Sequence, residues 1–227
     1  CVLPSDQTGT FDGKWRMAPV PIAVAAGQFS DYEKSVIRMA VQRWNALASA
    51  VYGMPLLDPG PSGVTESSIA RPSFVCGNSA DNPPMISGSS YIGRVTIYKN
   101  ATWPYPNAPT AIAITSTCPT SATPLNIFYK GMIDLNYQSF FVSGKRVPDL
   151  QSILVHEFGH LLGLRHSCET TTSREGVPSC NDPGLNPAYK EAVMYPVFGF
   201  APDGSGEKRY KLNSNDEGRM NCLYIGS

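Results

Sequence analysis

The chain has 227 residues, of which 42% are hydrophobic, so it can bury the core of one domain. Its 18 Lys and Arg residues balance 18 Asp and Glu residues, and no basic run occurs. Because nucleic-acid binding needs clustered positive charge to neutralise phosphates, this composition excludes a nucleic-acid partner. No apolar run approaches the ~20 residues that a membrane-spanning helix requires, which excludes a transmembrane segment.

Six cysteines indicate an oxidising compartment, and we expect a secreted, extracellular or cell-surface protein. No signal peptide is visible, so we expect the sequence to begin after one has been removed. Cys1 then has two readings: a diacylglyceryl thioether, as in an outer-membrane lipoprotein, or one half of a disulfide, with Cys222 as the favoured partner. A third reading makes Cys1 a thiolate that blocks a metal.

The first half of the chain predicts strands around one long helix. Residues 19–25 have the apolar density of a strand, with proline at its start. Ser30 and Glu33 form a capping box, after which apolar residues at helical spacing predict a helix over residues 31–49. Residues 50–92, rich in Pro, Ser and Gly, are expected to form loop. Apolar and β-branched residues then predict three strands, over residues 94–98, 111–115 and 131–136.

The second half predicts two more helices. The longer one begins at Pro148 and Asp149 and carries a run of apolar residues on one side. Residues 167–182 are rich in Ser, Thr, Cys and Gly, which indicates a loop-rich lower lobe. Ser214 and Glu217 repeat the capping-box pattern and predict a short final helix. Strands that precede and flank two large helices indicate the α+β class.

The three histidines of the chain all fall within residues 156–166. His156 and His160 are four residues apart, so on a helix they share one face, and their imidazoles can bind one zinc ion at ~2.0–2.1 Å. Gly163 can end that helix in a left-handed conformation and bring His166 back as a third ligand. Three protein nitrogens leave the fourth tetrahedral position open, which is typical of a catalytic zinc rather than a structural one.

Glu157 follows the first of these histidines and is the candidate catalytic residue. Its carboxylate can reach a zinc-activated water without binding the metal. It can take the proton as the water attacks a carbonyl, and return that proton to the leaving amine. A purely structural zinc site would not require this glutamate.

Residues 156–166 match H-E-x-x-H-x-x-G-x-x-H, the metzincin zinc motif, and residues 192–196 (Ala-Val-Met-Tyr-Pro) resemble the methionine turn of that family. The resemblance is closest to the matrixin type, because Ser167 follows the third histidine and Met-Tyr-Pro forms the turn. Residues 131–136 are similar to the family's strand ahead of the zinc helix, and residues 212–224 to its last helix. The long insertions and the cysteines fit a bacterial matrixin-like endopeptidase better than a tissue collagenase.

This resemblance implies a metzincin-like α+β fold: a twisted mixed β-sheet with two long helices above a zinc cleft, and a small loop-rich lower lobe ending in a helix. One catalytic domain would span residues 1–227, with an upper subdomain at 1–163 and a lower one at 164–227. Met194 would form a hydrophobic floor under the imidazoles without binding the metal. One catalytic zinc ion is implied, with His156, His160 and His166 as its ligands, whereas nothing in the sequence supports calcium.

The resemblance also implies protein or peptide substrates, and we expect a monomer. A peptide would lie extended and antiparallel to the edge strand near residues 111–115. In metzincins the segment after the methionine turn walls the pocket for the P1′ side chain, just past the scissile bond. The corresponding residues, 196–200, carry no charge, so we expect apolar P1′ side chains to be preferred over charged ones.

The predicted function is a zinc-dependent endopeptidase with Glu157 as the general base. One alternative is a binding or adhesion protein that keeps a metzincin scaffold without turnover; retention of Glu157 argues against it. A second alternative is a zinc amidase that acts on cell-wall peptides, which neither the metal chemistry nor the spacing distinguishes from a protease.

Overall fold

The computed structural model describes residues 11–15, 18–76, 95–120, 126–142, 144–171 and 176–225. The strands are β1 (Lys14–Trp15), β2 (Val20–Ala25), β3 (Leu57–Asp58), β4 (Thr65–Ser67), β5 (Val95–Asn100), β6 (Ala113–Thr120) and β7 (Ile127–Asn136). The helices are α2 (Asp31–Tyr52), α3 (Leu150–Leu162), α4 (Pro187–Lys190) and α5 (Ser214–Ile225). Cys1 lies outside the described residues, so its readings remain predictions.

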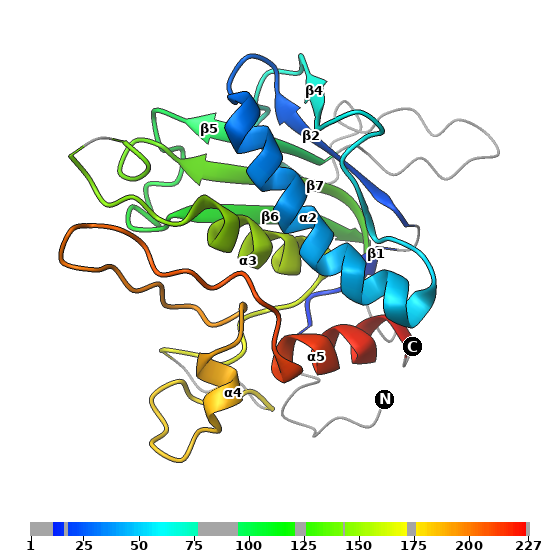
Figure 1. Ribbon diagram of the computed structural model, residues 1–227, viewed down its shortest axis with the longest axis vertical. Helices are drawn as coiled ribbons and strands as arrows, with labels where there is room; N and C mark the ends of the chain where they lie inside the picture. The colour runs from blue at the N-terminus through cyan, green and yellow to red at the C-terminus, as the bar shows by residue number, and fades with distance from the viewer. Residues whose placement is uncertain are drawn as a thin grey trace.

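The strands form one mixed sheet, and the two long helices α2 and α3 lie side by side on one of its faces (Figure 1). The strand order is β1-β7-β5-β2-β3, with β4 also on β2, and all of these pairings are parallel. β6 differs, because it pairs antiparallel with β7 and has no second partner among the described strands. The α+β class and the metzincin-like arrangement predicted from the sequence are confirmed.

Helix α2 begins as its sequence predicts. The Ser30 side chain accepts a hydrogen bond from the Glu33 amide, and the Glu33 carboxylate accepts one from the Ser30 amide at 2.8 Å. The helix runs to Tyr52 and ends at Gly53, which has a positive φ of 73°. The predicted loop over residues 50–92 is therefore partly wrong, because it contains the end of α2 and the short strands β3 and β4, while residues 77–92 lie outside the described ranges.

Helix α3 is the buried element that carries the zinc motif. The Asp149 side chain caps its N-terminus by accepting from the Ser152 amide at 2.8 Å, as the sequence predicts. Two tryptophans fix it from neighbouring elements: Trp44 donates to the Val155 carbonyl at 2.8 Å, and Trp15 donates to the Leu161 carbonyl at 2.7 Å. Helix α3 is therefore fixed by hydrogen bonds from both α2 and β1.

The predicted capping box of the last helix is wrong by one residue. The Asn213 side chain accepts from the amides of Asn215 and Asp216, and the Asp216 carboxylate accepts from the Asn213 amide at 3.1 Å. The cap therefore joins Asn213 to Asp216, not Ser214 to Glu217. The final helix itself is confirmed.

Two disulfides join pairs of cysteines that both lie within the described ranges. Cys76 pairs with Cys118 on β6, and Cys168 pairs with Cys180 in the loop-rich region after α3. No cysteine of the described residues is free. These bridges agree with the oxidising compartment that the cysteine count indicates.

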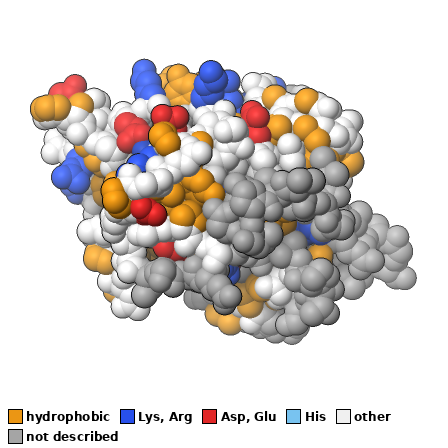
Figure 2. Space-filling model, turned by 90° about the horizontal axis from the view of Figure 1, so that it is seen from below, with side chains coloured by type: hydrophobic (Ala, Val, Ile, Leu, Met, Phe, Trp, Pro, Cys, Tyr) orange, Lys and Arg blue, Asp and Glu red, His pale blue; other side chains and the backbone are white. Residues whose placement is uncertain are grey.

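None of the helices in the described ranges is long and apolar enough to cross a membrane. On the face drawn in Figure 2, basic and acidic side chains are interspersed, and neither sign forms a large patch.

Candidate metal centre

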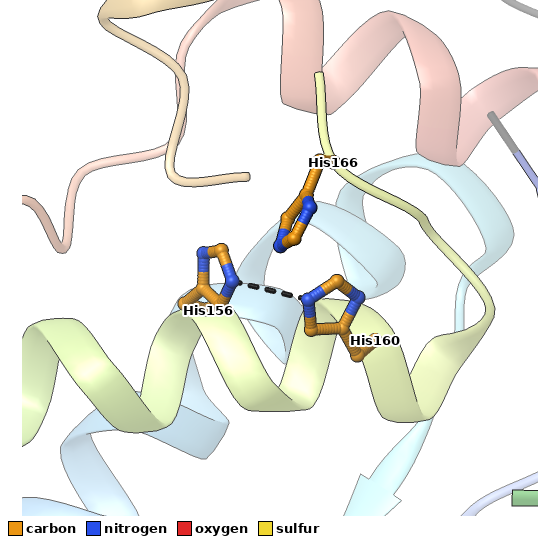
Figure 3. A group of neighbouring side chains, drawn as sticks. All are labelled: His156, His160 and His166. Atoms are coloured by element: carbon orange, nitrogen blue, oxygen red, sulfur yellow. Dashed lines mark hydrogen bonds between the residues drawn. The ribbon is translucent and has the colours of Figure 1, made fainter. Parts of the chain in front are cut away.

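Three imidazoles converge at the end of α3. His156 and His160 lie one turn apart on the helix, and His166 faces them from the chain that follows it (Figure 3). One ligand atom from each residue can be chosen so that all three atoms lie within 4.8 Å of one another. The structure thus brings together the three histidines that the sequence singles out.

Backbone carbonyls orient the two helical histidines. Nδ1 of His156 lies 2.7 Å from the Val193 carbonyl, and Nδ1 of His160 lies 2.8 Å from the Leu164 carbonyl. Because a carbonyl only accepts, each Nδ1 carries the proton, and each Nε2 presents a lone pair. These two Nε2 atoms are 3.1 Å apart, close to the roughly 3.3 Å expected for two nitrogens on one tetrahedral zinc ion. Two lone pairs that face each other in this way fit a cation between them.

Burial keeps the imidazoles in the form that binds metal. It lowers the pKa of His160 to about 4 and that of His166 to about 3, and it holds the pKa of His156 well below its ordinary value. All three rings are therefore neutral at pH 7, and a neutral imidazole is the form that coordinates a metal ion.

The Glu157 carboxylate faces strand β6. Oγ of Thr115 lies 2.6 Å from its Oε2, so the hydroxyl can donate to the carboxylate. Burial raises the pKa of Glu157 to about 7, although the hydrogen bonds with Thr115 lower it in part. Such a group can accept a proton and release it near neutral pH, which is the requirement for a general base that later acts as an acid.

Gly163 makes the chain reversal that brings His166 back. Its φ is 107°, a conformation that favours glycine, and a Cβ there would lie 1.8 Å from the carbonyl oxygen of Gly13. The segment before β1 crosses at this point, because the Asp12 amide donates to the Gly163 carbonyl at 2.9 Å. Asp12 also pairs with Arg165, beside the third histidine.

Met194 is fully buried against the zinc helix. A Cβ on Gly159, between the two helical histidines, would lie 2.2 Å from its Sδ. The Ser167 amide donates to the Met194 carbonyl at 2.9 Å, which ties the turn to the chain that follows His166. The packing under α3 agrees with the predicted hydrophobic floor, whose role stays a prediction.

Two buried charged residues of α5 hold this lower segment. The Asp216 carboxylate accepts from the amides of Val193 at 2.9 Å and Met194 at 3.2 Å. The Arg219 guanidinium donates to the carbonyls of Arg165 at 2.7 Å and His166 at 3.3 Å. Helix α5 therefore positions both the methionine turn and the third histidine.

A cavity of about 630 Å³ opens beside the histidines and Glu157. One wall consists of residues 110–115, leading into the edge strand β6, and another contains the uncharged segment 196–200 except for Gly199. The ring of Phe198 meets His156 edge to face at 5.4 Å. Arg146 also lines this cavity and adds a positive charge that the segment 196–200 lacks. The apolar P1′ preference expected from that segment alone stays a prediction.

The fold and the histidine cluster resemble the arrangement of the metzincin class of zinc metalloproteases. The matrixin family model matches residues 83–173, a span that includes β5, β6, β7, α3 and all three histidines. This match confirms the resemblance to the matrixins and supports a zinc metalloprotease in general. No curated protein matches the chain.

Four residues near the site have no signal in the sequence. Thr115 reaches Glu157 from a strand 42 positions earlier, and Arg219 reaches His166 from 53 positions later. Asp12 and Arg146 also line the cavity, and they belong to segments whose sequence carries no motif. Only the position of Asp216, three residues after Asn213, could have indicated a capping role.

Proposed function

We propose that this protein is a zinc-dependent endopeptidase that hydrolyses peptide bonds with Glu157 as its general base. The observation that carries the proposal is the convergence, beside one open cavity, of three imidazoles and a buried carboxylate. A structural zinc site would not need that carboxylate, nor a cavity of substrate size.

His156, His160 and His166 would hold the zinc ion through one nitrogen each. When bound, zinc supplies a Lewis acid that polarises the scissile carbonyl and makes a water more acidic. Glu157 takes the proton of the attacking water and passes it to the leaving amine. Thr115 keeps the carboxylate directed into the cavity through its hydroxyl.

An extended substrate would lie along the open edge of β6. The residues that lead into this strand line the cavity, and their backbone can pair with a peptide by strand addition. The proposed catalytic domain covers residues 1–227, with an upper subdomain at 1–163 and a lower one at 164–227. We propose a monomer that is secreted or exposed at the cell surface, as the disulfides support; a lipid anchor at Cys1 remains a prediction.

The test is hydrolysis of a denatured protein by the zinc-loaded enzyme, with Glu157→Gln as the key variant. We expect this variant to bind one zinc ion as the wild type does, but to lose ~10²–10⁴-fold in turnover, because a base and not a ligand has been removed. His166→Ala should instead lower the zinc content.

Near wild-type turnover in Glu157→Gln would contradict the mechanism. Zinc binding without hydrolysis of any protein would favour a catalytically idle binding protein, and hydrolysis of cell-wall peptides alone would favour an amidase.

A further inference from the structure

The wall of the active-site cavity carries a cation without an acidic partner. Arg146 lines the cavity and is exposed, and its guanidinium carbon lies 5.1 Å from the ring centroid of Phe200. None of the carboxylates in the described ranges forms an ion pair with it. Two other arginines differ in this respect, because Arg209 pairs with Glu207 and Arg165 pairs with Asp12.

Arg146 is presented by a loop whose backbone is fixed. Its carbonyl accepts from the Phe141 amide at 3.2 Å. The next residue, Val147, donates to the Gly204 carbonyl at 2.9 Å and accepts from the Gly206 amide at 2.9 Å. The backbone is therefore fixed at the arginine and at the residue after it, and the guanidinium lies over the Phe200 ring.

Aromatic side chains of the same cavity wall link the histidines to this cation. Phe198 touches His156, and Phe200 stacks on Phe140 with ring centroids 6.4 Å apart. A substrate side chain in this cavity would have both apolar surface and the positive charge of Arg146 in the surrounding wall. The acidic residues that line the cavity do not neutralise that charge, since Glu157 faces Thr115 and Asp12 pairs with Arg165.

We propose that Arg146 makes this enzyme select an acidic side chain, glutamate first, at the P1′ position of its substrates. The proposal rests on the proposed endopeptidase function. The methylene groups of glutamate can pack against the aromatic wall while its carboxylate accepts charge-assisted hydrogen bonds from the guanidinium. The other side chains fit less well than glutamate: aspartate has one methylene group fewer, glutamine carries no charge, and lysine is repelled by the guanidinium.

The experiment compares peptides that differ only at P1′, as Glu, Gln, Leu or Lys, with amidated C-termini so that no other carboxylate lies near. In the wild type we expect kcat/KM for Glu to exceed that for Gln about three- to tenfold, a preference that shrinks as salt is raised. Arg146→Gln should bring the Glu to Gln ratio within about twofold of one, and Arg146→Glu should favour Lys over Glu. Arg38→Gln, an exposed arginine of α2 that does not line the cavity, changes the net charge equally and should keep the wild-type ratio.

Hydrolysis with equal rates for Glu and Gln would overturn the role of Arg146 and leave the endopeptidase function intact. The same holds for a Glu preference that survives in Arg146→Gln. If no peptide is hydrolysed, the proposed function fails. Fluorescence anisotropy then measures how tightly the same peptides bind to the zinc-loaded protein, which tests the role of Arg146 separately. Tighter binding of the Glu peptide that disappears in Arg146→Gln supports the acidic subsite; equal binding overturns it.

Discussion

Gly159 stands between two of the metal-binding histidines because a larger residue has no room there. A Cβ at this position would lie 2.2 Å from Sδ of Met194 and 3.0 Å from Cζ2 of Trp44. Both neighbours are fully buried, and the Met194 amide is fixed by Asp216, so neither can move away freely. The absence of a side chain thus lets the methionine turn pack directly under the helix.

Gly159→Ala should therefore destabilise the protein. In an ordinary helix interior, alanine stabilises by roughly 1 kcal/mol relative to glycine. Here we expect the reverse, a loss of about 1–3 kcal/mol from overpacking, measured by urea unfolding of the zinc-loaded protein. The double variant with Met194→Ala should lose less than the sum of the two single changes, because the smaller side chain makes room for the methyl group. A higher free energy of unfolding for Gly159→Ala alone would show that Met194 leaves room for a side chain at this position.

At the scale of single elements, the start of α2 depends on one carboxylate. Glu33 accepts hydrogen bonds from the Ser30 amide at 2.8 Å and the Tyr137 hydroxyl at 2.9 Å, and it pairs with Lys99. Partial burial alone would raise the pKa of Glu33, but these bonds outweigh it and lower the pKa to about 2. Glu33 thereby joins the helix to β5 and to the residue that follows β7.

This pKa predicts a specific acid sensitivity. Because the pKa of Glu33 is lower in the folded chain than the ordinary value of 4.5, its contribution is fully present above pH 4.5 and is lost as the pH falls towards 2. Glu33→Gln should cost about 1–2 kcal/mol at pH 7 and flatten the dependence of unfolding free energy on pH in that window. The matched control is Glu191→Gln, at an exposed residue after α4, which should leave the curve unchanged. An equal slope in wild type and Glu33→Gln would refute this assignment.

Helix α5 fixes the methionine turn and the backbone at the third histidine. Asp216 is fully buried and accepts from the amides of Asn213, Val193 and Met194, so one carboxylate caps the helix and fixes the methionine turn. Its burial raises its pKa despite these hydrogen bonds. Arg219, equally buried, donates hydrogen bonds to the carbonyls of Arg165 and His166.

Asp216→Asn should weaken the attachment of α5 to the methionine turn. An asparagine has one oxygen that accepts, so at least one buried amide loses its partner, at a cost of about 1–3 kcal/mol. We expect a lower Tm together with weaker zinc binding, measured by competition with a chelator. Asp182→Asn, at an exposed loop residue, serves as the control and should change neither quantity. Loss of stability with unchanged zinc affinity would confine the role of Asp216 to the helix cap.

Long periodic elements are readable from the sequence, but the side chains that cross between them are not. The apolar spacing predicts α2 and α3, and the histidine spacing predicts the metal centre, because both depend on local geometry. β3 and β4 span two and three residues, too few to show a period. For the cap of the last helix, Asn213–Asp216 and Ser214–Glu217 both have the required spacing. The choice falls on the first pair because the Asp216 carboxylate also accepts a hydrogen bond from the buried amide of Val193 in the methionine turn. Arg146 and Thr115 enter the site through tertiary pairings that no local pattern encodes.

At the scale of the whole molecule, the site is a junction of distant segments. The cavity is bounded by β6, by α3 and by the segment after the methionine turn. His156 and His160 belong to a helix buried under α2, whereas His166 lies on a chain held by α5 and by Ser167. A metal ion bound to all three therefore links the helical layer to the loop-rich part below it, in addition to any catalytic work.

Zinc removal should accordingly lower the stability of the fold as well as its activity. A ligand that binds only the folded state stabilises it by RT ln(1 + [L]/Kd), about 4 kcal/mol at a thousandfold excess over Kd. For a domain of this size that corresponds to a fall in Tm of roughly 8–16 °C when a chelator strips the metal. Zinc should restore the Tm, while calcium and magnesium, which prefer oxygen ligands, should not. Glu157→Gln keeps all three ligands and should show the full shift, and His166→Ala should show little of it. A Tm that does not respond to chelation of a demonstrably zinc-loaded protein would mean that the ion adds no link between the two layers.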